Sequence, residues 1–85
     1  MEKEKMINLS DGLNRVWWDI TLERRNHLDI VERLAMYIIR VSRTGEYNLK
    51  LISWTIECLA ANQIERAKNH LNELICAVSP AYMED

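Results

Sequence analysis

Hydrophobic positions between residues 11 and 44 recur every three or four residues, which is the spacing of one face of an α-helix. The run comprises Leu13, Trp17, Ile20, Leu28, Val31, Ala35 and Ile38, and Arg24 is its one polar member. Ser10 can cap the first turn, and Gly45 suits the position just past the last turn. The pattern therefore predicts one long helix over about residues 11–44, with Asn26 and His27 as the expected site of any kink.

A second periodic region covers residues 48–78 and has two interpretations. Asn62 and Glu65 have the layout of a capping box, which would start a new helix. This predicts a helical hairpin over about 48–61 and 63–78, packed against the long helix. Alternatively, the spacing continues through residues 60 and 64, so 48–78 is one helix and two such chains form a four-helix bundle. In the hairpin version the buried face of the last helix comprises Ile64, Ala67, Leu71, Leu74, Ile75 and Val78.

The whole pattern indicates a small all-α bundle in one domain over residues 1–85. The chain has one proline, two glycines and no strand-like alternation of polar and apolar residues. Residues 1–9 contain the charged run "MEKEK" and are expected to form a flexible tail. Residues 80–85 begin at Pro80, which stops the last helix, and are expected to form a second tail.

The adjacent tryptophans Trp17 and Trp18 favour self-association. Neighbouring residues on a helix point about 100° apart, so a narrow apolar stripe cannot bury both rings. Each ring removes roughly 150–250 Å² from water when it is buried. We therefore predict a homodimer formed by two-fold packing of the long helix. The alternatives are a different protein partner, or a monomer that buries both rings. The expected interface comprises Leu13, Trp17, Trp18, Ile20, Arg24, Leu28 and Val31.

Composition places limits on the partner and on the compartment. Thirteen acidic and eleven basic residues give a net charge of -2, which disfavours a surface built to neutralise phosphates. Cys58 and Cys76 lie among apolar helical residues, so we expect two reduced thiols rather than a disulfide. The N-terminus has no apolar leader, and no apolar run approaches the ~18 residues of a membrane span. These features predict a cytoplasmic protein that does not enter membranes.

Motifs for catalysis, metals or cofactors are not found. His27 and His70 do not stand at metal-ligand spacing to each other or to Cys58 and Cys76. Gly12 is isolated, so a phosphate-binding loop is excluded, and no nucleophile-elbow sequence is present. We therefore expect neither a cofactor nor an enzymatic activity.

Nucleic-acid binding is an alternative function. The hairpin over 48–78 can be interpreted as a helix-turn-helix, and its second helix carries side chains of types that contact base edges. The candidate contacts are Gln63, Arg66, Lys68 and Asn69. Glu65 and Glu73 share that helix, so we rank DNA binding below protein binding.

A small dimeric enzyme is a further alternative. Arginines are concentrated on the long helix: Arg15, Arg24, Arg25, Arg33, Arg40 and Arg43. The plan of one long and two shorter helices is similar to that of the small helical chorismate mutases, whose active sites use arginines from both chains. The resemblance implies an arginine-lined pocket between subunits, but it is one of architecture alone. The spacing of the basic residues departs from that family, and the second helix lacks its acidic and basic cluster.

These observations together predict a small non-enzymatic protein-interaction module. Its surplus of apolar helix surface and its lack of catalytic motifs suit an adaptor, a chaperone-like subunit or an inhibitor, of the kind that phages and plasmids encode. The expected interaction surface is the apolar face of the long helix.

Overall fold

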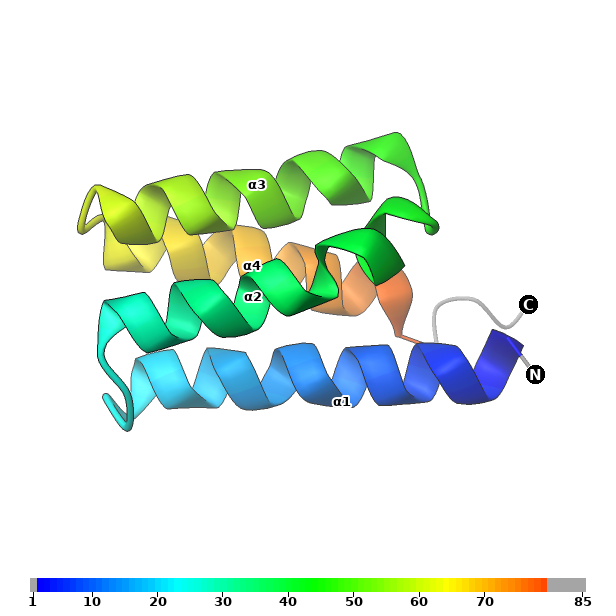
Figure 1. Cartoon of the computed structure of the whole chain (residues 1–85), viewed down its shortest axis with the longest axis horizontal. Helices are drawn as coiled ribbons and strands as arrows, with labels where there is room; N and C mark the ends of the chain where they lie inside the picture. The colour runs from blue at the N-terminus through cyan, green and yellow to red at the C-terminus, as the bar shows by residue number, and fades with distance from the viewer. Residues whose placement is uncertain (1, 80–85) are drawn as a thin grey trace.

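The computed structural model describes the backbone of residues 2–79 and the side chains of residues 9–79, and this part contains four helices (Figure 1). They are α1 (Glu2–Thr21), α2 (His27–Ser42), α3 (Glu46–Ala60) and α4 (Ile64–Val78). They run alternately up and down, and each packs against two neighbours in the order α1, α2, α3, α4 and back to α1. The diagonal pairs α1–α3 and α2–α4 have no Cα atoms within 8 Å of each other in the described residues. The expected all-helical bundle is confirmed, and one chain supplies all four helices.

The prediction of one long helix over 11–44 is wrong, because α1 ends at Thr21. The N–H of Arg24 donates to the carbonyl of Asp19 at 3.0 Å, and the N–H of Glu23 donates to that of Ile20 at 3.3 Å. Glu23 has φ of 53°, so these bonds form a Schellman motif with glutamate in the left-handed position. The chain then reverses, and α2 returns alongside α1 (Figure 1).

The start of α2 coincides with the expected kink site. Asn26 is its N-cap, and its Oδ1 accepts a 2.8 Å hydrogen bond from the N–H of Asp29. The start of α1 differs from expectation, because the helix begins at Glu2 and Ser10 lies inside it. Residues 2–9, which we expected to form a tail, are therefore helical, and the expected tail over 80–85 lies outside the described residues.

The hairpin over 48–61 and 63–78 is confirmed to within about two residues at each end, and the single helix over 48–78 is wrong. Asn62 marks the break, but it does not cap α4. It adopts φ of 61° and ends α3, where the N–H of Gln63 donates to the carbonyl of Cys58 at 2.7 Å. The expected capping box is therefore replaced by a second Schellman motif.

All four helices contribute to one continuous core, in which α1 and α4 supply four side chains each. It comprises Leu9, Leu13, Val16 and Ile20 of α1, Ile30, Leu34 and Val41 of α2, Leu51, Ile52 and Leu59 of α3, and Ala67, Leu71, Leu74 and Val78 of α4. The face predicted for α4 is confirmed, with Ile64 and Ile75 half-buried at its margins.

The inward face of α2 differs from the predicted stripe. Ile30, Leu34 and Val41 point into the core, whereas Leu28 and Ala35 of the predicted stripe are exposed. The loop between α1 and α2 separates two helices. Residues before and after it therefore do not share one helix face, even where they are three or four positions apart in the sequence. Among residues 2–79, no helix combines the length and apolar character needed to span a membrane.

Candidate functional site

Helix α2 carries a second apolar surface on the side opposite the core. Leu28, Met36 and Ile39 are 68%, 78% and 67% exposed. At 100° per residue these three side chains lie on the far side of the helix from Ile30 and Leu34. We use the name outer face of α2 for the following residues: Leu28, Asp29, Glu32, Ala35, Met36, Ile39, Arg40 and Arg43.

Four charges of the outer face are segregated along the helix, and a fifth exposed charge, Arg33, lies beside its acidic half about 60° from Met36. Asp29 and Glu32 lie in the N-terminal half, and Arg40 and Arg43 lie at the C-terminal end. The guanidinium of Arg40 also lies 5.9 Å from the centre of the Tyr37 ring. Acids near the N-terminus and bases near the C-terminus are favourable for the helix dipole. The outer face is therefore an apolar patch with an acidic end and a basic end.

The adjacent tryptophans of α1 have different surroundings. Trp17 is half-buried on the side facing α4, where the Nζ of Lys68 lies 5.0 Å from the centre of its ring. Trp18 is 45% exposed and meets the Trp17 ring edge-on, with 5.0 Å between centroids. One tryptophan thus packs within the bundle, and the other extends the apolar surface on the outside of α1.

The residues predicted for the interface do not share one surface. Leu13 and Ile20 are core residues, which corrects their assignment to the interface. Trp17 and Val31 are half-buried, and Trp18, Arg24 and Leu28 are exposed. Arg24 has a carboxylate neighbour within its own chain, because its Nη1 lies 3.8 Å from Oδ1 of Asp19. Arg25 Nε lies 3.4 Å from the other oxygen of the same carboxylate.

Sequence reasoning missed Met36 and Ile39, although the chain contains a signal that would have found them. Residues 23–27 read "ERRNH", five consecutive polar residues inside an otherwise periodic apolar pattern. Such a run is typical of a loop, even without glycine or proline. A break placed there allows α2 to take its own phase, and Met36 and Ile39 then fall opposite its core face.

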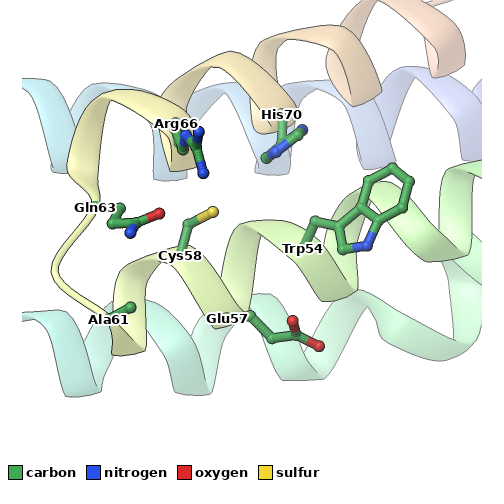
Figure 2. A pocket seen from close by; sticks show the side chains of 7 residues that line it. All are labelled: Trp54, Glu57, Cys58, Ala61, Gln63, Arg66 and His70. Carbon is green, nitrogen blue, oxygen red and sulfur yellow. The ribbon is translucent and has the colours of Figure 1, made fainter.

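A shallow hollow of about 430 Å³ lies between α3 and α4 (Figure 2). Its lining comprises Trp54, Glu57, Cys58, Ala61, Gln63, Arg66 and His70. The Trp54 ring lies 5.5 Å from that of His70 and 6.1 Å from that of Tyr47, so the aromatic rings form a row along this side. Cys58 is a free, half-buried thiol, as is Cys76 elsewhere on the protein. The hollow is open and carries both charge signs.

The row of aromatic rings ends in a hydrogen bond between α3 and α4. The hydroxyl of Tyr47 donates to Oε2 of Glu73 at 2.8 Å. This bond raises the pKa of Tyr47 above its ordinary value of 10.0, and desolvation and the negative charge of Glu73 act in the same direction. The phenol is therefore a donor throughout the neutral range.

The candidate nucleic-acid contacts are divided between two sides of α4. Gln63 and Arg66 line the hollow, and Asn69 is exposed. Lys68 instead points towards α1, where its Nζ lies over Trp17 and 3.9 Å from Oε2 of Glu65. Helices α3 and α4 lie alongside each other (Figure 1), whereas the helices of a helix-turn-helix cross at a steep angle. The structure therefore does not assemble these four residues into one reading surface.

The plan shared with the helical chorismate mutases is also altered, because two helices replace the long one. The six arginines are distributed over α1, the loop after it, α2 and the turn that ends α2, and none of them lines the hollow, whose lining includes Arg66. Among the described residues, no three His, Cys, Asp or Glu side chains are placed to hold a metal ion.

No protein-family model, no curated protein and no solved structure matches this chain.

Proposed function

We propose that this protein is a non-enzymatic protein-interaction module that binds its partner through the outer face of α2. The observation that carries the proposal is the exposure of Leu28, Met36 and Ile39 on one side of one helix. Grouped apolar side chains of this size are uncommon on the surface of a small monomer and are typical of a binding site.

The free energy available on this face is large for a small domain. Fully burying a Leu, Ile or Met side chain contributes about 1.5–3 kcal/mol, so covering the exposed part of these three contributes about 3–6 kcal/mol as an upper estimate. The entire stability of a typical domain is about 5–15 kcal/mol. A partner that covers the outer face therefore gains substantially, whereas the exposed part of these side chains does not stabilise the fold.

This role suits an adaptor, a chaperone-like subunit or an inhibitor, because each of these acts by presenting a surface rather than by catalysis. The free thiols of Cys58 and Cys76 suit a reducing compartment such as the cytoplasm. Trp18 on the adjacent helix offers an aromatic side chain of the kind enriched in binding hot spots.

Site-specific photo-crosslinking in cells of the native host tests this proposal. A photoreactive amino acid replaces Met36 on the outer face, or Asn69, an exposed residue of α4, as the matched control. We expect discrete crosslinked products from position 36 and none of the same mass from position 69. Equal products from both positions, or none from either, would contradict the proposal.

A further inference from the structure

We propose that the partner of the outer face is the same face of a second copy, packed antiparallel about a two-fold axis that passes beside Met36. The inference rests on the proposed function, because it names the partner of that surface. It is drawn from the order of charges along α2 and from the side on which the apolar residues lie.

Four charges are arranged with opposite sign about Met36, and Arg33, about 60° from Met36 around the helix, lies at the edge of this arrangement. Asp29 and Glu32 lie seven and four residues before it. Arg40 and Arg43 lie four and seven residues after it. At 100° per residue all four are within about 40° of Met36 around the helix, and they stand about 6 and 10 Å from it along the axis. A two-fold axis at Met36 therefore places the acidic end of each copy over the basic end of the other.

The apolar side chains of the outer face lie on one flank of this charged line. Leu28, Ala35 and Ile39 are all displaced from Met36 in the same direction, by between about 60° and 100°. A two-fold axis perpendicular to both helices keeps this flank on the same side of the interface in the two copies. The two flanks then join into one apolar strip beside the ion pairs, and Met36 meets its own equivalent at the centre.

Parallel packing of the two α2 helices is unfavourable both for the charged residues and for the apolar residues. It would set Asp29 and Glu32 of one copy against the same acids of the other, and the arginines likewise, and like charges in contact are unfavourable. It would also place the apolar flanks on opposite sides of the interface. The helix dipoles would point the same way, whereas antiparallel helices place opposite ends together. Both the polar and the apolar residues therefore favour the antiparallel arrangement.

The size of the surface sets the expected strength of the dimer. Helix α2 has 16 residues, so it is about 24 Å long, and one pair of such helices buries less than the standard protein interface of about 1,600 Å². We therefore expect a reversible dimer whose population rises across the micromolar range. The proposed ion pairs join side chains that are exposed or half-exposed in the single chain, so added salt should weaken the dimer.

Charge reversal tests both the partner and the register. One double variant, Asp29→Lys with Glu32→Lys, makes the charged line wholly basic. The other, Arg40→Glu with Arg43→Glu, makes it wholly acidic. We expect each alone to dissociate at least about tenfold more readily than the wild type, and an equimolar mixture to form a heterodimer at least as stable as the wild-type dimer. Sedimentation velocity on the full chain, across concentration, distinguishes about 20 kDa from the chain mass of 10.1 kDa.

Two single variants separate binding from folding. Met36→Lys places like charges at the two-fold axis on a residue that is 78% exposed, so the monomer should keep its helicity and lose self-association. Asn72→Lys adds the same charge to an exposed position of α4 and should leave the dimer unchanged. Circular dichroism on every variant confirms that the fold is retained.

Three results would overturn the inference: a wild-type chain that stays monomeric at the highest concentration, a dimer that survives Met36→Lys, or reversed variants that do not associate when mixed. A monomeric wild type whose position 36 still crosslinks to a different protein would refute the dimer and leave the proposed interaction module standing. A monomeric wild type that yields no crosslink at position 36 would refute both.

Discussion

Replacing Gly12 by alanine tests how closely α1 and α2 approach. A Cβ at this position would lie 2.7 Å from Cζ and 3.0 Å from Cε1 of Tyr37, and closer still to its hydroxyl oxygen. Real Cβ atoms do not approach carbon atoms this closely, so the half-buried Tyr37 ring must move by about an ångström or more. Glycine at residue 12 therefore allows the contact between the two helices.

Two opposing effects determine the magnitude. Alanine in the interior of a helix is more stable than glycine by about 0.5–1 kcal/mol. Overpacking a well-packed site costs about 1–3 kcal/mol. We expect the second effect to be larger, so Gly12→Ala should lower the free energy of unfolding by about 1 kcal/mol. For a domain of 85 residues this corresponds to a fall in Tm of roughly 4–8 °C.

The decisive comparison repeats the substitution in a Tyr37→Leu background. The leucine side chain does not extend to the tyrosine hydroxyl, so Gly12→Ala should there raise the free energy of unfolding by about 0.5–1 kcal/mol. Urea denaturation followed by circular dichroism measures all four proteins, with equal m-values as the check on two-state behaviour. If Gly12→Ala has the same effect in both backgrounds, the Tyr37 ring does not pack against residue 12.

Three further changes follow from particular contacts. Asn26→Ala removes the cap of α2 and should lower the free energy of unfolding by about 1 kcal/mol in urea denaturation, whereas no change would mean that water replaces the cap. Thr21→Val removes a buried hydroxyl that has no partner among the described residues, so the free energy of unfolding should stay the same or rise. Thr55→Val removes a hydroxyl that donates to the carbonyl of Leu51, so the free energy of unfolding should fall by about 1 kcal/mol. Because the pKa of Tyr47 is raised, its contribution to stability is complete below pH 10 and falls as the pH rises through the folded-state pKa. Ultraviolet titration of wild type against Tyr47→Phe should show this phenol ionising above pH 10, and Glu73→Gln should lower its midpoint.

The sequence was sufficient to predict the helical class and the inward face of α4, but not the inward face of α2. The inward face of α4 was correct because its apolar residues belong to one uninterrupted helix, so their spacing reports one surface. The hairpin between α3 and α4 was placed within about two residues for a different reason. Asn62 was interpreted as the cap of a new helix because Glu65 follows it by three residues, whereas it ends α3 in the left-handed conformation that asparagine tolerates.

The break after α1 could not be found from the usual helix-stop residues. Glu23 occupies the left-handed position of the Schellman motif, where glycine is the common choice. The nearest physical compensation is Asp19, whose carboxylate lies within 4.0 Å of nitrogens of both Arg24 and Arg25 and whose carbonyl accepts from Arg24. A local cluster of charges within residues 19–25 thus accompanies a turn that the backbone preference of glutamate alone would not favour.

The candidate site was missed for the same reason, since a helix's outward face is known only when its phase is known. If residues 20–28 are counted as one helix, Leu28 and Ala35 belong to the interior, and Met36 and Ile39 have no assigned role. Once Asn26 starts a new helix, Ile30 and Leu34 turn inward, and the same apolar residues lie outside. One loop residue in an unusual conformation therefore changes which residues of α2 form its outer face.

The charges of α2 link the fold to the proposed assembly. Asp29 in the first turn and Arg40 in the last stabilise the isolated helix through its dipole, by about 0.3–1 kcal/mol each. The same order of charges makes the outer face complementary to its own antiparallel copy. A sequence selected only for helix stability would need charges at the two ends, but it would not need Met36, Leu28 and Ile39 between and beside them. The coexistence of terminal charges with an exposed apolar centre is therefore better explained by recognition than by folding.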